Sequence, residues 1–237
     1  MSIEKNLFGE DLILDKTNKA SKISRRKEKQ RTLYDYFNLD ILNRIPINHK
    51  DGMPVLEPYN GVIPNRMVGF EEAYTKKETD CIVHFFEDDR RFLRLFRNPE
   101  KYLAFLKECT LVIEPDLSQY VNMPYPLRLA HAYLNRAMAV YLQKNGCRVV
   151  SNLTWSLQDS YQYSKAGRPE NSIVAVNCTG VLGHDMSMYL WREGYKNIVL
   201  PLRPTRIIRY GDRMPDENSA ISVYFENERL ERLRYGS

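Results

Sequence analysis

The chain has 237 residues, of which 43% are hydrophobic and 27% are charged, and its formal net charge is +5. This composition is that of an ordinary soluble globular protein. No apolar run approaches the roughly 20 residues that cross a bilayer, and residues 1–5 lack the basic head and apolar stretch of a targeting peptide. We therefore expect a cytoplasmic protein with no membrane partner.

The positive charge is concentrated near the amino terminus. Residues 16–31 hold eight Lys or Arg and one Glu, a net charge of +7, whereas residues 32–237 carry a net charge of +1. A segment so rich in charge cannot bury enough apolar surface to offset its ordering entropy. We expect residues 1–31 to form a disordered basic arm and residues 32–237 to form a single α/β domain.

Basic side chains in such an arm suit the phosphates of DNA or RNA, because each neutralised phosphate releases counterions. The same charges would also serve a solubilising tail, which is the alternative interpretation. The residues expected to bind nucleic acid are Lys22, Arg25, Arg26, Lys27, Lys29 and Arg31.

The octapeptide QRTLYDYF, residues 30–37, follows this basic run. It resembles the PIP-like box with which replication and repair proteins dock on the sliding clamp of archaea and eukaryotes, and Gln30, Leu33, Tyr36 and Phe37 match its four positions. The resemblance implies a tight helical turn that places the aliphatic and aromatic side chains in an apolar pocket of the clamp. The same spacing is typical of an amphipathic helix, so docking on the chain's own core is the alternative.

The four cysteines, Cys81, Cys109, Cys147 and Cys178, are far apart in the sequence and lie beside predicted apolar strands. This arrangement indicates reduced thiols in the core. A zinc site is not expected, because the sequence has no close Cys pair.

The elements expected after residue 80 alternate between strands and helices. One helix is predicted where Asn98-Pro99-Glu100 provides a cap, a first-turn proline and an early acid. A longer helix is predicted to stop at Asn145-Gly146. The proline-rich residues 46–64 could add one or two irregular strands. In chain order the predicted elements are strand 81–86, helix 98–108, strand 111–113, helix 125–144, and strands 147–150, 172–176, 206–209 and 221–225.

This alternation predicts right-handed crossovers and a mainly parallel sheet. Five or six strands are fewer than a full eight-stranded barrel contains. We predict a small or incomplete TIM-barrel-like α/β fold, with an open doubly wound sheet as the alternative.

Polar residues follow the predicted strands, at the carboxyl edge of the sheet where parallel α/β proteins place their active sites. Paired carboxylates there could act as general acid and base or hold Mg²⁺, and a tryptophan could stack on a sugar or base. The candidate catalytic residues are Glu87, Asp88, Asp89, Glu114, Asp116, Trp155 and Asn177.

A structural interpretation competes with the catalytic one. Asp88, Asp89 and Asp116 stand where helix caps belong, and the arginines at 90, 91, 94 and 97 could neutralise them. Asn135 and Arg136, in the middle of the longer predicted helix, are expected on the surface, and the alternative is that they cap a buried polar network or reach the rim.

Several motifs occur in a specific order: VHFFEDDRRFLRLFRNPEKYL, EPDLSQYVNMP, YLNRAMAVYLQKNGCRVV and IVAVNCTGV. Together they resemble the uncharacterised phage and bacterial family known as domain of unknown function four-four-one-seven, over about residues 60–212. The resemblance implies a phage or mobile-element context and supplies no reaction.

Two functional hypotheses follow from these patterns. The first is a phage or mobile-element accessory protein that associates with nucleic acid through its arm. The second is an enzyme whose carboxylate-lined pocket acts on a nucleotide, a nucleic acid or a sugar-containing substrate.

Overall fold

A computed structural model describes residues 4–5, 11–12, 45–47, 50–215 and 219–227. The chain divides into two units, Met1–Thr32 and Leu33–Ser237. In the first unit, β1 (Glu4–Lys5) pairs antiparallel with β2 (Asp11–Leu12). The predicted nucleic-acid-binding residues and the clamp-like octapeptide lie outside the described residues.

The second unit contains a seven-stranded sheet in which every pairing is parallel. Each strand pairs with the next one along the chain, whereas a doubly wound sheet reverses its strand order at a switch point. The fold is therefore a nearly closed, TIM-like barrel, as the sequence predicts. The strands are β3 (Met67–Gly69), β4 (Ile82–His84), β5 (Leu111–Ile113), β6 (Val149–Asn152), β7 (Ile173–Asn177), β8 (Arg206–Tyr210) and β9 (Ser222–Phe225).

The curvature of the sheet is visible in a contact between distant strands. His84 of β4 and Tyr210 of β8 are separated by three intervening strands, yet their ring centroids lie 4.6 Å apart. Because side chains alternate between the two faces of a strand, one face of each strand fills the inside of the barrel. This inner cluster consists of Ile82, Leu111, Ile113, Val150, Ile173, Ala175 and Ile208.

The described residues of this segment, 46–47 and 50–64, add no strand to the sheet, so this part of the prediction is wrong. They contain one isolated bridge, between Ile47 and Pro54. The backbone carbonyl of Tyr59 accepts a 2.9 Å hydrogen bond from the N–H of Ile173, the first residue of β7. Tyr59 and Ile63 also pack against the inner cluster, so this segment lies at the amino end of β7.

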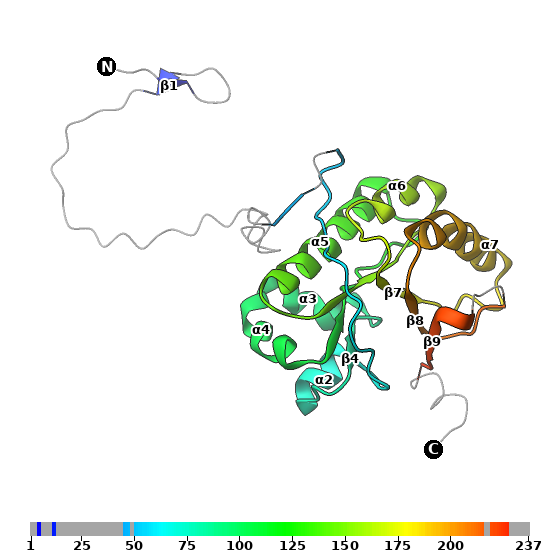
Figure 1. The fold of residues 1–237 in the computed structure, drawn as a ribbon. Coiled ribbons are helices and arrows are strands. Elements are labelled where there is room, and N and C mark those ends of the chain that lie inside the picture. Colours follow the sequence, from blue (N-terminus) through cyan, green and yellow to red (C-terminus); the bar gives the residue numbers. More distant parts are fainter. Residues whose placement is uncertain (1–3, 6–10, 13–44, 48–49, 216–218, 228–237) are drawn as a thin grey trace. The chain divides into compact units, whose positions relative to one another are not determined.

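Helices connect the strands and cover the outside of the barrel (Figure 1). Both helices predicted from the sequence are present, α4 within one residue of its predicted start. Of the described helices, none has the length and apolarity needed to cross a membrane. The α-helices are α2 (Phe70–Lys76), α3 (Asp89–Arg97), α4 (Pro99–Glu108), α5 (Tyr125–Lys144), α6 (Tyr161–Lys165) and α7 (Asp185–Gly194), with shorter helical turns at Gln158–Ser160, Tyr195–Val199, Leu200–Leu202 and Ser219–Ile221.

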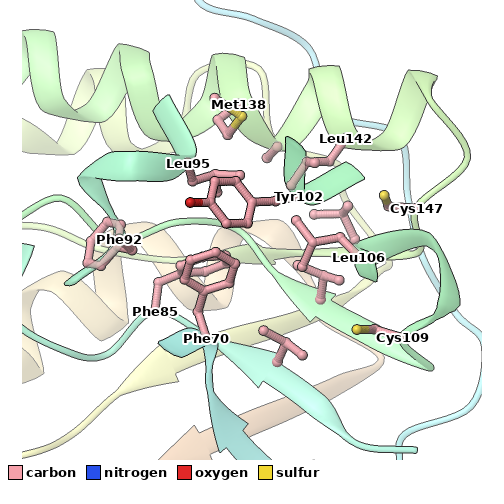
Figure 2. Packing of buried hydrophobic residues seen from close by; sticks show 14 of the residues in the cluster. Phe70, Phe85, Phe92, Leu95, Tyr102, Leu106, Cys109, Met138, Leu142 and Cys147 are labelled. Carbon is pink, nitrogen blue, oxygen red and sulfur yellow. The ribbon is translucent and has the colours of Figure 1, made fainter. Parts of the chain in front are cut away.

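Two apolar clusters hold the helices to the barrel. The larger one packs helices α2, α3, α4 and α5 against strands β3, β4, β5 and β6. Figure 2 shows Met138 and Leu142 of α5 facing Tyr102 and Leu106 of α4. The smaller one packs α7 against β7 and β8 and includes Trp191. All four cysteines are buried and free, as the sequence predicts.

Candidate active site

A pocket of about 370 Å³ lies where β5, β6 and β7 end. This is the edge of the barrel at which TIM-like enzymes place their active sites. The volume falls near the lower end of the 300–1,000 Å³ range of small-molecule sites. The segments after these strands and α7 supply its lining: Asp116, Gln119, Tyr120, Val121, Leu153, Thr154, Trp155, Ser156, Asn177, Thr179, Gly180, Val181, Ser187, Leu190 and Trp191.

Asp116 is the only charged residue among the described residues that line this pocket. Its Oδ1 accepts hydrogen bonds of 2.7 Å from Thr154 Oγ1 and 2.9 Å from Asn152 Nδ2. Burial raises the pKa of Asp116 to about 6, although these two hydrogen bonds act to lower it. A carboxyl group with a pKa near neutrality can both accept and donate a proton, as general acid–base catalysis requires.

Glu114 lies two residues before Asp116 but does not line the pocket. It is 1% exposed and forms ion pairs with Arg136 at 2.9 Å and Arg168 at 2.6 Å. Burial alone would raise the pKa of Glu114, but the two guanidinium groups outweigh it and hold this pKa below its usual value. Glu114 also accepts a 2.9 Å hydrogen bond from the backbone N–H of Asn152, and so fixes the residue that hydrogen-bonds Asp116.

The surface position expected for Asn135 and Arg136 is wrong, and the alternative, a buried polar network, is confirmed. Arg136 is fully buried and forms an ion pair with Glu114. Asn135 accepts a 2.9 Å hydrogen bond from the backbone N–H of Leu117 and so ties α5 to the loop after β5. Both side chains therefore support the segment that carries Asp116.

Asp88 and Asp89 belong to the beginning of α3 and do not line the pocket. Asp88 caps the helix by accepting a 3.0 Å hydrogen bond from the backbone N–H of Arg90, and it forms an ion pair with the same arginine. Asp89 accepts a 3.0 Å hydrogen bond from Ser118 Oγ in the loop after β5.

Glu87, after β4, also lies outside the pocket lining. Its carboxylate lies over Gly69, so that a Cβ at that glycine would collide with it. Burial raises the pKa of Glu87, and its Oε2 has no hydrogen-bond partner among the described residues. The structure thus separates Glu87 from Asp116.

Trp155 and Asn177 line the pocket together with Asp116. Trp155 Nε1 donates a 2.9 Å hydrogen bond to the carbonyl of Leu190, and its indole lies against Gly194 of α7. Asn177 Oδ1 accepts a 2.9 Å hydrogen bond from the backbone N–H of Thr179, which shapes the turn after β7.

Trp191, Gln119 and Thr179 also line the pocket and were not among the candidate residues predicted from the sequence. Trp191 comes from α7, a helix that was not predicted. The spacing of Met188, Trp191 and Tyr195 is that of one helical face, and this signal could have revealed the helix.

No cluster of three or more His, Cys, Asp or Glu side chains that could hold a metal ion occurs in the part of the chain that the structure describes. Glu114, one of the strand-end carboxylates that could hold Mg²⁺, is instead paired with two arginines.

The parallel barrel and its carboxyl-edge pocket define a TIM-like α/β protein with the architecture of a small-molecule site. Residues 45–226 match the family described as Domain of unknown function (DUF4417). Since this match covers more than half of the chain, the protein belongs to that family.

Two curated phage proteins are similar to the chain. The "Gene 1 protein" of Mycobacterium phage L5 is 30% identical over 129 residues, which cover 54% of this chain and 56% of that protein. The "Gene 1 protein" of Mycobacterium phage D29 is 27% identical over 129 residues, which cover 54% of this chain and 48% of that protein. The alignment thus spans about half the length of each relative. No solved structure matches the chain.

Proposed function

We propose that residues 45–226 form a barrel enzyme whose active site is the carboxyl-edge pocket and whose general acid–base is Asp116. The observation that carries this proposal is the setting of Asp116: a partly buried carboxyl group, held by Thr154 and Asn152, in a pocket with no other charged lining residue among those described. A structural carboxylate in this position would be expected to have an ion-pair partner, as Glu114 does.

The site suits a reaction in which a single side chain first accepts a proton and then donates it. Asp116 would remove a proton from a water molecule or a substrate hydroxyl group and return it to the leaving group. Trp155 provides an aromatic wall, and Asn177 provides an amide for a polar group of the substrate. A substrate that contains a sugar or a base, such as a nucleoside, nucleotide or glycoside, fits this lining.

The test is a turnover screen. The purified full chain would be incubated with pools of nucleosides, nucleotides and glycosides, and the loss of substrate and the gain of product would be followed by mass spectrometry. We expect Asp116→Asn to abolish product formation while the variant remains folded. Asp80→Asn is the matched control, because Asp80 is exposed at the opposite, amino end of the barrel. Equal turnover by Asp116→Asn and the unmodified chain would refute the proposal.

We propose a second function for the amino-terminal arm, which is association with nucleic acid in a phage or mobile-element context. The concentration of a net charge of +7 in residues 16–31 supports it. Docking of residues 30–37 on a sliding clamp is a further proposal. It is tested by the binding of a peptide of residues 25–42 to a purified clamp, and absence of binding would refute it.

A further inference from the structure

We propose that the carboxyl-edge pocket binds a small organic cation, whose ammonium group pairs with Asp116 Oδ2 and lies against the rings of Trp155 and Tyr120. This inference rests on the proposed function, since it names the substrate class of the same pocket. The class is a compound of about the size of a sugar that carries a positively charged amino group.

The pocket contains one carboxylate oxygen that a ligand can reach. Asp116 is partly exposed, and its Oδ1 accepts the hydrogen bonds from Thr154 and Asn152. Its Oδ2 accepts none from the described residues, and it is not one of the fully buried polar atoms that lack a partner among them. Oδ2 is therefore open to the pocket and free to accept a hydrogen bond from a ligand.

No lysine or arginine stands opposite this carboxylate among the described lining residues of the pocket. Arg168 acts electrostatically on Asp116, but its side chain is buried outside the lining and forms an ion pair with Glu114 at 2.6 Å. Asp89 and Glu114, which also act on Asp116, are both acids. An ionised Asp116 thus lacks a close partner of opposite charge, and a cationic ligand would provide one.

Two further acids border the pocket. Asp212 accepts a 3.2 Å hydrogen bond from the backbone N–H of Gly180, a lining residue. Asp185 lies in the first turn of α7, the helix that contributes Ser187 to the lining. Arg213, next to Asp212 in the sequence, lies over the ring of Tyr224 and outside the lining. The charges around the pocket therefore favour a cationic ligand over an anionic one.

Two aromatic side chains provide the second part of a cation site. Tyr120 is 63% exposed, Trp155 is partly exposed, and both line the pocket. The electron-rich face of an aromatic ring attracts a cation, most strongly in tryptophan. The Trp155 ring is held by its 2.9 Å hydrogen bond to the carbonyl of Leu190. Trp191 is not part of this site, because its ring is buried and already lies 5.5 Å from the guanidinium of Arg209.

The experiment compares ligands of similar size and different charge. The full chain is studied at pH 7, where a carboxyl group with a pKa of about 6 is mostly ionised. Calorimetry measures the binding of glucosamine, glucose and glucuronate, and of choline and its uncharged carbon analogue, neohexyl alcohol. We expect at least one of the two cations to bind at least tenfold more tightly than its neutral counterpart, and glucuronate not to bind.

Three variants locate the site. Tyr120→Leu removes the ring but keeps an apolar side chain, and it should weaken cation binding at least threefold without changing the melting temperature, because Tyr120 is an exposed residue. Tyr189→Leu is the matched control that keeps binding, since Tyr189 is 60% exposed on α7 but outside the lining. Asp116→Asn should reduce the preference for the cation over its neutral counterpart to less than threefold.

Each other result overturns the inference. Equal binding of cations and their neutral counterparts would show that charge is not recognised, and binding of glucuronate would assign the pocket to anions. An unchanged preference in Asp116→Asn would place the cation elsewhere. Absence of binding by both cations would remove this ligand class. If turnover of a nucleoside or glycoside still depended on Asp116, the proposed function would survive while this inference failed.

Discussion

Glu114 and Asp116 lie two residues apart and hydrogen-bond to the same residue, Asn152, yet their pKa values move in opposite directions. Glu114 accepts from the backbone N–H of Asn152, and Asp116 accepts from its side-chain amide. Two arginines lower the pKa of Glu114 against the effect of burial, whereas burial dominates at Asp116 and raises its pKa to about 6. One short segment therefore holds a structural carboxylate and a carboxyl group suited to proton transfer.

The ion pairs of Glu114 predict a large loss of stability when its charge is removed. Glu114→Gln leaves Arg136 and Arg168 buried without their shared carboxylate, and breaking a buried pair in this way costs about 3–5 kcal/mol. Urea unfolding measures the change. Glu170→Gln is the matched control, because Glu170 pairs with Arg203 on the surface, where loss of a pair costs less than about 1 kcal/mol. Similar losses in the two variants would show that the buried pairs contribute no more than a surface pair.

His84 predicts an acid-dependent loss of stability. Burial lowers its pKa to about 3, and its Nδ1 accepts a 3.1 Å hydrogen bond from the backbone N–H of Phe86. Between pH 6.5 and pH 3 the unfolded chain binds the proton that the folded chain excludes. The contribution of neutral His84 is therefore complete above pH 6.5 and is lost as the pH falls towards 3, by about 5 kcal/mol in total.

The test is the pH dependence of the unfolding free energy. His84→Phe keeps a ring next to Tyr210 but has no titrating group, so its stability should fall less steeply between pH 6.5 and pH 4. Replacing the exposed His184 with Gln should leave the slope unchanged. Parallel pH profiles for His84→Phe and the unmodified protein would contradict the assignment.

The absence of a side chain at Gly194 leaves room for the indole of Trp155 in the pocket wall, so a larger residue at this position should destabilise the protein. A Cβ at this position would collide with the indole of Trp155, including Nε1, which donates to Leu190. Gly194→Ala should therefore destabilise the protein by about 1–3 kcal/mol, as overpacking does. It should also shift the tryptophan emission, since Trp155 and Trp191 are the two tryptophans of the chain. Adding Trp155→Phe should recover part of the loss; a double variant with fully additive losses would argue against the collision.

The charge of the arm predicts salt-sensitive binding to nucleic acid. Deleting residues 1–31 should remove most of the affinity for a duplex oligonucleotide at low salt and flatten the plot of log affinity against log salt concentration. Fluorescence anisotropy across a salt series measures both quantities. A full-length variant with Gln at the six basic positions 22, 25, 26, 27, 29 and 31 separates charge from length. Unchanged affinity in both forms would exclude the arm as the binding element.

The barrel was predictable from the sequence because strong local signals agreed with the tertiary structure. Helix α5 has the predicted bounds, since Asn145-Gly146 ends it with a glycine at φ +91°. Strand β3 was missed because three residues after a proline-rich segment give little periodicity. Helix α3 was missed although the spacing of Phe92, Leu95 and Phe96 is that of one helical face. Two of its arginines, Arg91 and Arg94, form ion pairs with Glu71.

The candidate site was predictable only in part. Strand ends identified Asp116, Trp155 and Asn177 as neighbours at one edge, and these three residues line the pocket. The separation of Glu114 from them follows from Arg136 and Arg168, which lie 22 and 54 residues away in the sequence. The contribution of Trp191 depends on how α7 packs against the barrel. Pairings over such distances leave no mark on local sequence patterns.

The pKa of the Asp116 carboxyl group is the most direct measure of the central claim. Carbon-detected NMR of aspartate-labelled protein, titrated from pH 3 to pH 8, would report it, with Asp116→Asn identifying the signal. The account predicts a pKa of about 6. A pKa at or below the ordinary aspartate value of about 3.9 would contradict the assignment of Asp116 as the general acid–base.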